Sequence, residues 1–323
     1  MREPLAQALT DRPFLVLDGA LATELERRGA DLRDPLWSAK TLLERPHMIH
    51  AVHLDYFLAG ADIATTATYQ ASFEGFARRG LSVAAAAQAL RDAVALAAAA
   101  REVFWSEPSN RTNRLKPLVA ASVGPYGAML ADGSEYRGRY AASDRELADF
   151  HGPRLEALAH SGADLIACET LPCLREALVL ARLLGEFPAV SAWMSFSCRD
   201  GAHNCEGEDI ADCAAALDGF VQVAAIGINC TAPHYVGELL RRIAKRTGKP
   251  LLAYPNSGQA YDPDTKRWSG AEPGVPLTLS ARDWYDAGAR LIGGCCRTTP
   301  ADIRALSDFR KTLMADPARP VKS

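Results

Sequence analysis

Short runs of hydrophobic residues alternate with amphipathic segments along the whole chain. The runs have the length and β-branched content of buried strands, and they predict strands at 14–17, 61–69, 118–124, 163–170, 190–197, 223–230, 250–256 and 289–296. Apolar residues at helical spacing predict helices at 20–26, 48–58, 82–104, 144–161, after Pro172, and at 210–217, 234–246, 279–287 and 300–314. Alternation of this kind implies a parallel sheet. Eight strand–helix units in 323 residues fit one closed (β/α)8 barrel, a TIM-type α/β fold, better than two open sheets.

The helix-to-strand turns share a short phrase. Gly-Ala-Asp or Gly-Ala-Arg stands before three of the predicted strands, at 60–62, 162–164 and 288–290. Glycine commonly ends a helix, so the phrase indicates a turn and not a functional repeat. No linker interrupts the pattern. The sequence therefore predicts one catalytic barrel domain over 1–315 and a short tail at 316–323.

Composition narrows the class of function. The formal net charge is −3 and no segment clusters basic residues, so nucleic acid is not an expected partner. No uninterrupted apolar run reaches the ~18 residues of a membrane span, and no membrane partner is expected. The N-terminal residues lack the apolar core of a signal peptide, which makes the eight cysteines reduced thiols by default. We expect a cytoplasmic protein.

Two of the predicted strands end in cysteines. Cys230 is the last residue of one, and Cys295 and Cys296 are the last two residues of another. The carboxyl ends of the strands form the working face of such a barrel, so these thiols can meet there. Three thiols predict a soft-metal site, zinc above all, and three protein ligands leave a fourth position open, as catalytic zinc sites do. Adjacent cysteines cannot both face one way on a regular strand, and Gly293-Gly294 is expected to supply the irregular backbone that turns them together.

Each of these residues also has a structural interpretation. Cys295 and Cys296 could form a vicinal disulfide or pack as two small side chains. Asp18 could be a helix N-cap. Glu169 is harder to explain in this way, because a carboxylate at a central strand tip is costly unless it is paired. The other five cysteines are interpreted as core residues or bystanders.

Several motifs resemble one known family. Gly-Gly-Cys-Cys-Arg-Thr-Thr-Pro at 293–300 and Gly-Ile-Asn-Cys at 227–230 are similar to motifs of the homocysteine S-methyltransferases. The resemblance extends over nearly the whole chain, through Asp-Gly-Ala at 18–20 and the motifs at 53–56, 122–127, 132–136, 168–172 and 254–258. The Asp-Gly-Ala and Gly-Gly-Cys-Cys motifs are shared with betaine- and folate-dependent relatives. Gly-Pro-Tyr-Gly and Asp-Gly-Ser-Glu-Tyr resemble the branch that uses S-methylmethionine or S-adenosylmethionine.

The resemblance implies the reaction and its metal. It implies Zn2+ bound by Cys230, Cys295 and Cys296, which are thereby the catalytic residues, and Asn256 as a fourth ligand before substrate arrives. Homocysteine is the implied methyl acceptor and a sulfonium compound the implied donor, with methionine as the product. Zinc favours the nucleophilic thiolate of the acceptor, so no general base is needed.

The resemblance also implies where the substrates bind. Asp18 and Glu169 are placed near the ammonium of homocysteine, and the backbone of Gly19 and Ala20 near its carboxylate. Strand-tip residues Ser122 and Asn229 are predicted to line the same pocket. The donor's sulfonium is a cation that an aromatic face can receive. The candidates for that face are Tyr126, Tyr136 and Trp268.

Other functions stay open at this point. A betaine-type or selenocysteine-type methyltransferase of the same family is one alternative. A non-catalytic barrel that binds zinc or thiols is a second. A zinc hydrolase is a third, but its ligands are usually histidines and carboxylates that leave the metal acidic enough to activate water. Three cysteines argue against it.

Overall fold

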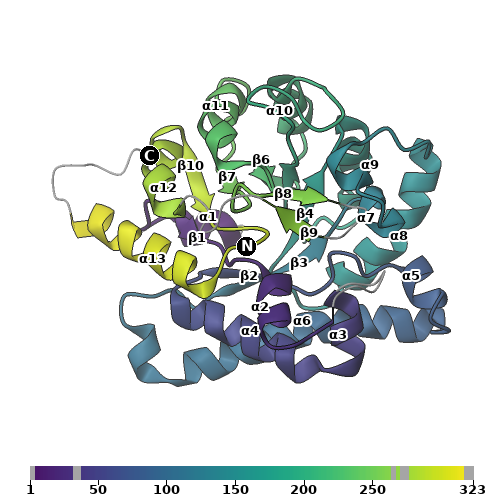
Figure 1. Ribbon diagram of the computed structural model, residues 1–323, viewed down its shortest axis with the longest axis horizontal. Coiled ribbons are helices and arrows are strands. Elements are labelled where there is room, and N and C mark those ends of the chain that lie inside the picture. Colours follow the sequence, from purple (N-terminus) through teal and green to yellow (C-terminus); the bar gives the residue numbers. More distant parts are fainter. Residues whose placement is uncertain (1–3, 32–37, 263–266, 270–275, 316–323) are drawn as a thin grey trace.

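A computed structural model describes residues 4–31, 38–262, 267–269 and 276–315, so the predicted tail at 316–323 lies outside the described residues. Eight parallel strands form one sheet in the order β1-β10-β7-β6-β5-β4-β3-β2. They are β1 (Leu15–Val16), β2 (Ile63–Thr65), β3 (Leu118–Val123), β4 (Leu165–Leu171), β5 (Ala192–Phe196), β6 (Val223–Asn229), β7 (Leu251–Tyr254) and β10 (Ala289–Ile292). A parallel bridge between Leu17 and Ile63 joins the two outermost strands and closes the barrel. The predicted single (β/α)8 barrel is confirmed (Figure 1).

A ring of helices surrounds the strands (Figure 1). It consists of α4 (Pro46–Ala59), α6 (Val83–Ser106), α8 (Asp144–Ala159), α9 (Leu174–Leu184), α10 (Ile210–Asp218), α11 (Pro233–Ile243), α12 (Leu277–Asp286) and α13 (Pro300–Ala315). Each packs on the next, and α13 packs on α4, so the ring is also closed. Shorter helices are α1 (Pro4–Leu9), α2 (Leu21–Arg27), α3 (Ser38–Glu44), α5 (Phe73–Ala77), α7 (Tyr126–Leu130) and the 3-10 turns η1 (Pro108–Arg111) and η2 (Ser134–Tyr136).

Local sequence signals explain where helices begin and end. Ser143 and Glu146 form a reciprocal capping box at the start of α8. The glycine of the repeated Gly-Ala-Asp or Gly-Ala-Arg phrase has a left-handed backbone in all three places, with φ of 118° at Gly60, 83° at Gly162 and 111° at Gly288. Glycine adopts this conformation without steric penalty. The phrase therefore marks a helix end, as predicted.

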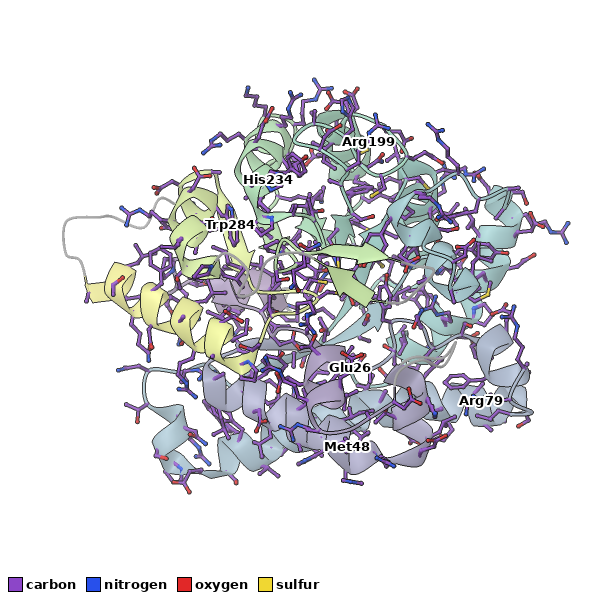
Figure 2. The ribbon with its side chains drawn as sticks, viewed as in Figure 1. Glu26, Met48, Arg79, Arg199, His234 and Trp284 are labelled. Atoms are coloured by element: carbon purple, nitrogen blue, oxygen red, sulfur yellow. The ribbon has the colours of Figure 1, made fainter. Side chains whose placement is uncertain are left out.

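Alternate strand residues divide the core into two layers. One set fills the barrel interior and includes Leu15, Leu17, Trp193 and Leu252, and Leu5 of α1 joins it. The other set packs outward against the helices, where Trp284 of α12 is fully buried (Figure 2). Successive strand residues point to opposite faces, which produces this division.

The structure differs from the predicted boundaries in three places. The antiparallel hairpin of β8 (Ala260–Asp262) and β9 (Arg267–Ser269) lies where the sequence predicts only a long loop. Strand β10 ends before the cysteines, and β2 is shorter than the β-branched run at 61–69 suggests. The hydroxyl of Thr68 donates to Ser122 O (2.6 Å), and the amide of Ser122 donates to Thr66 Oγ1 (3.1 Å). The amide of Thr66 still donates to Ala120 O (3.0 Å), and beyond it side chains replace the backbone ladder.

Helix α6 passes the length and composition test for a membrane span, the one helix in the described residues to do so. The sequence analysis predicts this segment as a helix, at 82–104, and Arg91 and Asp92 interrupt its alanine-rich run. Its buried residues recur at helical spacing, and the helix packs between α4 and α8. This is the packing of a helix in the ring around a barrel.

Candidate active site

Three thiols meet at the carboxyl ends of β6 and β10. Cys230 Sγ lies 2.7 Å from Cys295 Sγ and 3.4 Å from Cys296 Sγ, and all three sulfur atoms lie within 4.8 Å of one another. Strand β7 separates β6 from β10, so the two chain segments approach from either side of it. All three residues are free cysteines, because a disulfide would bring two sulfurs to about 2.05 Å.

The backbone beyond β7 aligns these segments. The amide of Cys230 donates to Tyr254 O (3.1 Å), and the amide of Cys295 donates to Pro255 O (2.7 Å). The amide of Ser257 donates in turn to Cys296 O (3.1 Å). Cys230 itself has φ of 45°, a left-handed conformation that turns the chain directly after β6. The thiols therefore lie on the loops just beyond the strands, and not on the strands as predicted.

The two glycines before Cys295 lie in irregular backbone beyond β10, and they have a role besides the predicted one. Neither has a positive φ. A Cβ atom on Gly293 would lie 2.5 Å from Leu17 Cβ, and one on Gly294 would lie 2.3 Å from Thr298 Oγ1. Glycine is needed here because β1 and the start of α13 approach the chain closely.

The cluster has the chemistry of a soft-metal site. Four ligands around zinc at about 2.3 Å place sulfur atoms roughly 3.8 Å apart, which falls within the observed spread of the thiols. Hydrogen bonds from Cys295 and Cys296 hold the pKa of Cys230 well below its usual value, and the pKa values of both donors are raised. The hydroxyl of Tyr136 lies 3.5 Å from Cys230 Sγ. The three residues therefore favour one thiolate even without an ion, and they fit a thiophilic cation.

The side chain of Asn229 joins the carboxyl ends of β4, β5 and β6 through hydrogen bonds. Its Oδ1 accepts from the amide of Thr170 (2.7 Å) and from Ser195 Oγ (2.9 Å), and its Nδ2 donates to Thr170 Oγ1 (2.7 Å). Cys295 Sγ lies 3.9 Å from the same Nδ2. The amide group is thus engaged by the protein itself, and its predicted contact with substrate stays a prediction.

Asn256 lies beside the thiols. Its Nδ2 is 3.4 Å from Cys230 O. Its Oδ1, the atom that would bind a metal, accepts a hydrogen bond from the amide of Gly258 (2.8 Å). An amide oxygen has a second lone pair, so this bond leaves room for a metal, and the fourth-ligand role stays a prediction.

Two buried carboxylates face the barrel mouth near the thiols. Asp18 follows β1 and accepts from the amide (2.8 Å) and hydroxyl (3.1 Å) of Thr65. Glu169 on β4 accepts from Ser122 Oγ and from the hydroxyl of Tyr254, the latter at 3.0 Å. Within the described ranges, neither carboxylate pairs with a lysine, arginine or histidine. Such a pair is suited to an organic cation supplied from outside.

The pKa values of Asp18 and Glu169 reflect the absence of a cationic partner among the described residues. Burial raises the pKa of Asp18 well above its usual range, and Glu169 adds to the rise. Burial raises the pKa of Glu169 to about 7, against the lowering effect of its bonds from Ser122 and Tyr254. Perturbed groups of this kind gather at functional sites.

The Gly19-Ala20 segment is clamped against the start of α13. A Cβ on Gly19 would lie 2.9 Å from both Thr298 Oγ1 and the Tyr56 hydroxyl. The amide of Ala20 donates to Thr298 Oγ1 (3.2 Å), and the Tyr56 hydroxyl donates to Ala20 O (3.1 Å). The segment is therefore fixed beside Asp18.

The aromatic candidates lie in different places. Tyr136 contacts the thiol cluster through its hydroxyl. The ring of Tyr126 packs on Phe150 and Tyr140, with centroids 5.1 and 5.5 Å apart, in a neighbouring hydrophobic cluster. The side chain of Trp268 lies outside the described residues.

Comparison with known proteins assigns the family. A family model described as homocysteine S-methyltransferase matches residues 15–309. The chain belongs to the homocysteine S-methyltransferase family. It is 55% identical over 310 residues to homocysteine S-methyltransferase YbgG of Bacillus subtilis, covering 96% of this chain and 98% of that protein. It is 48% identical over 304 residues to a selenocysteine Se-methyltransferase of Brassica oleracea, covering 91% and 88% respectively.

A solved structure of the same family superposes closely. The metallated form of the homocysteine methyltransferase MmuM from Escherichia coli has a TM-score of 0.86 and 48% sequence identity, over 95% of this chain and 99% of that one. Two relatives at 55% and 51% identity over nearly their whole length are homocysteine S-methyltransferases, so the chain is an enzyme of this family. The non-catalytic alternative is thereby set aside.

The sequence analysis of this methyltransferase did not identify the residues that position the two carboxylates of the site. Tyr254 donates to Glu169, and its hydroxyl oxygen accepts from Trp193 Nε1 (3.0 Å). Thr65 fixes Asp18. Tyr254 lies within a motif of the resemblance, and its inward position on β7 was the available signal. Thr65 offered none beyond its place at a strand end.

Proposed function

We propose that this enzyme transfers a methyl group from a sulfonium donor to the thiol of homocysteine, giving methionine, with Zn2+ bound by Cys230, Cys295 and Cys296. S-Methylmethionine is the proposed donor, and S-adenosylmethionine the second. The observation that carries the proposal is the meeting of three free thiols and two carboxylates without a cation at one barrel mouth. An amino acid that carries a thiol supplies an ammonium group for the two carboxylates and a sulfur ligand for the open position of the proposed metal.

The two carboxylates hold the ammonium group in this proposal. Asp18 and Glu169 are fixed by Thr65, Ser122 and Tyr254, so their oxygens need no reorganisation when the ammonium arrives. The ammonium replaces the missing counter-charge and lowers the raised pKa values of both groups.

The substrate carboxylate lies near Gly19 and Ala20 in this proposal. Because the amide of Ala20 already donates to Thr298, the donors available to the carboxylate are the amide of Gly19 and those that open α2. Ser122 contributes through Glu169, while Asn229 keeps the tips of β4, β5 and β6 in register.

A zinc ion bound by the three thiolates supplies the conditions under which the acceptor thiol is deprotonated at neutral pH. The proton leaves to solvent. The acceptor sulfur forms a bond to the methyl carbon, the bond from that carbon to the donor sulfur breaks, and its electron pair stays on the donor sulfur. The donor becomes a neutral thioether, which is methionine when the donor is S-methylmethionine. No residue of the chain needs to take up a proton or carry the methyl group.

A selenocysteine-type acceptor is the second candidate. The observation that favours it is the 48% identity to the Brassica oleracea selenocysteine Se-methyltransferase. A selenol is more acidic than a thiol, and the same cysteine cluster could receive it. Cytoplasmic location remains part of the proposal, supported by eight free cysteines that include close thiol neighbours.

A donor panel tests the proposal. Purified enzyme is assayed with homocysteine and S-methylmethionine, S-adenosylmethionine, betaine or methyltetrahydrofolate, and methionine is measured by mass spectrometry alongside zinc content. We expect one zinc per chain and turnover with a sulfonium donor. Turnover with betaine or methyltetrahydrofolate alone refutes the donor assignment. Full activity after complete removal of zinc refutes the metal assignment. Replacement of homocysteine by selenocysteine, at matched concentrations, ranks the two acceptors.

A further inference from the structure

Glu135 is a third buried carboxylate that the proposed roles leave unused. It belongs to η2, within the Asp-Gly-Ser-Glu-Tyr motif, and it is 9% exposed. Its Oε2 is buried and has no hydrogen-bond partner among the described residues. A buried carboxylate oxygen without a hydrogen-bond partner is costly, so a role at the site is the simplest reason for its presence.

The carboxylate lies on the thiol side of the mouth. The next residue, Tyr136, places its hydroxyl 3.5 Å from Cys230 Sγ. Besides burial, the charge of Glu135 raises the pKa values of Tyr69 and Tyr136, and the charge of Cys230 raises the pKa of Glu135. Glu135 and these groups therefore surround one part of the mouth, beside the position where the acceptor sulfur is proposed to bind.

The main chain of Glu135 is fixed on two sides. Its carbonyl accepts from Ser197 Oγ (2.8 Å) at the end of β5. Its amide lies 2.7 Å from where a Cβ on Gly127 would be, so η2 rests directly on α7. The backbone from which the carboxylate projects is consequently held in place.

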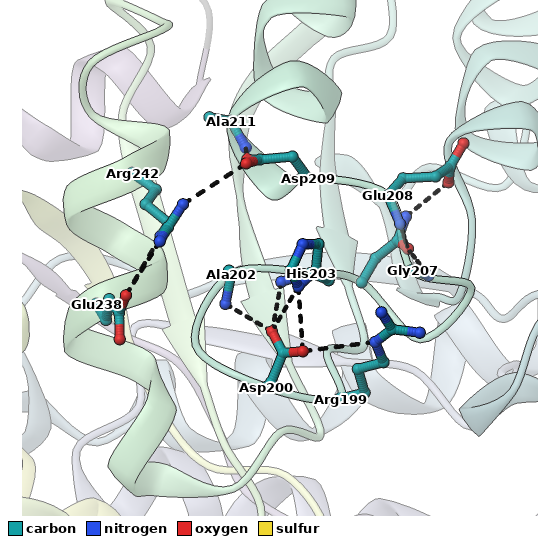
Figure 3. A network of polar contacts seen from close by, with 11 residues as sticks. Arg199, Asp200, Ala202, His203, Gly207, Glu208, Asp209, Ala211, Glu238 and Arg242 are labelled. Carbon is teal, nitrogen blue, oxygen red and sulfur yellow. Dashed lines mark hydrogen bonds and ion pairs between the residues drawn. The ribbon is translucent and has the colours of Figure 1, made fainter.

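The loop that supports Ser197 is itself braced by charged residues (Figure 3). Asp200 accepts from the amide and the ring Nδ1 of His203, at 2.8 and 3.0 Å, and lies 3.5 Å from Arg199. Asp209 caps α10, and Arg242 of α11 reaches it at 3.5 Å. The loop that follows Ser197, whose hydroxyl donates to Glu135 O, is thus connected to α10 and α11.

No cation of the chain neutralises Glu135 within the described residues. The basic group that acts on it is Arg137, whose side chain is 57% exposed and whose Nη2 donates to Asp132 O (2.8 Å). Burial raises the pKa of Glu135 to about 7, and Cys230 and Asp132 add to the rise. The mouth therefore presents three thiols and three buried carboxylates, Asp18, Glu169 and Glu135. The proposed ammonium of the acceptor serves Asp18 and Glu169, which leaves Glu135 without a cation, and a second organic cation fits there.

We propose that Glu135 is the counter-ion that binds the sulfonium group of the methyl donor and makes the enzyme prefer charged donors. This inference rests on the proposed function. In the reaction the donor sulfur keeps the electron pair of the broken carbon–sulfur bond and becomes neutral, while Glu135 neither gains nor loses a proton. Its attraction is present for the donor and absent for the demethylated product. Glu135 thus acts on donor binding and on release of the spent donor more than on the chemical step.

Two variants test this assignment. Glu135→Gln keeps the shape and removes the charge, and Glu135→Asp keeps the charge. Glu186→Gln is the control, because it removes one carboxylate charge from an exposed position that follows α9. The measurements are KM for S-methylmethionine, KM for homocysteine, zinc content, melting temperature, and inhibition by trimethylsulfonium, a sulfonium ion with no amino or carboxylate group.

We expect Glu135→Gln to raise KM for the donor and KI for trimethylsulfonium by about 10- to 100-fold, the range for removal of one charge-assisted interaction. The KM for homocysteine and the zinc content should be those of the wild type, and the melting temperature should be no lower. Glu135→Asp should recover part of the effect, and Glu186→Gln should change nothing. An unchanged donor KM in Glu135→Gln overturns the proposal. So does an increase in donor KM without an increase in KI, which would assign Glu135 to the donor's ammonium. Loss of zinc from Glu135→Gln also overturns it, in favour of a role at the metal. If the wild type uses no sulfonium donor, the proposed function fails first.

Discussion

Glu169→Gln removes one charge from the barrel mouth and leaves its shape in place. The glutamine side chain has the same length, and its oxygen can still accept from Ser122. The thiol cluster has no hydrogen bond to Glu169 among the described residues, so its geometry should survive. The variant therefore separates recognition of the acceptor's ammonium from metal binding.

The size of the effect follows from the charge-assisted hydrogen bond that this substitution weakens. A hydrogen bond to a charged group contributes about 1.5–3 kcal/mol net. At roughly 1.4 kcal/mol for each factor of ten, KM for homocysteine should rise about 10- to 150-fold. Asp18 remains, so we expect the lower part of that range. Zinc content should not change.

The pH dependence gives a second and independent test. Burial raises the pKa of Glu169 to about 7, so the carboxylate is present above that pH and lost as pH falls through it. The wild-type KM for homocysteine should therefore fall as pH rises through about 7, and this step should be missing in Glu169→Gln. Initial rates at saturating donor, from about pH 5.5 to about 8.5, measure both effects, with exposed Glu186→Gln as control. Joint loss of zinc and homocysteine affinity, or an unchanged KM, would show that the ammonium lies elsewhere.

Three further predictions follow from other parts of the structure. Cys295→Ser should lose zinc and methyl transfer together, and a variant that keeps full activity in a zinc-free preparation contradicts the metal site. Asp62→Ala should lower the free energy of unfolding by about 3–5 kcal/mol in urea titration, because it leaves buried Arg310 without its carboxylate partner; a loss below about 1 kcal/mol would mean that Arg310 finds another partner. Without substrate, stability should fall as pH rises from about 4.3 to about 7, since folded Glu169 keeps a proton that the unfolded chain releases. Thermal melts of wild type and Glu169→Gln over that window should diverge, and parallel curves would argue against the raised pKa.

The barrel could be predicted because its information is local. Each strand is a short apolar run and each helix a periodic one, and alternation of the two leaves few topologies. The strand at 61–69 was predicted too long because Thr66 and Thr68 have strand propensity but use their hydroxyls on the neighbouring strand. The β8–β9 hairpin was missed because strands of three residues are too short to show a period.

The candidate site was only partly predictable, for a different reason. Cysteines that follow two strands must approach one another once the barrel is known. The contacts around Glu169 and Glu135 depend on side chains from strands and loops far apart in the sequence, such as Tyr254 and Ser197. Such contacts leave no periodic pattern in the sequence.

The short strand β1 has a consequence for how acceptor affinity can be adjusted. Only two residues long, it meets β2 through one bridge, and the carboxylate of Asp18 extends that seam by accepting from the backbone of Thr65. The contact between β1 and β2, which has the fewest paired residues in the barrel, is thus reinforced by Asp18, and the same side chain faces the proposed substrate. Amides along this contact should be the first of the barrel to exchange in deuterated water, and saturation with an amino-acid ligand should slow them selectively. Substitutions that change the packing between β1 and β2 should then alter acceptor affinity and leave metal binding by the three cysteines unchanged.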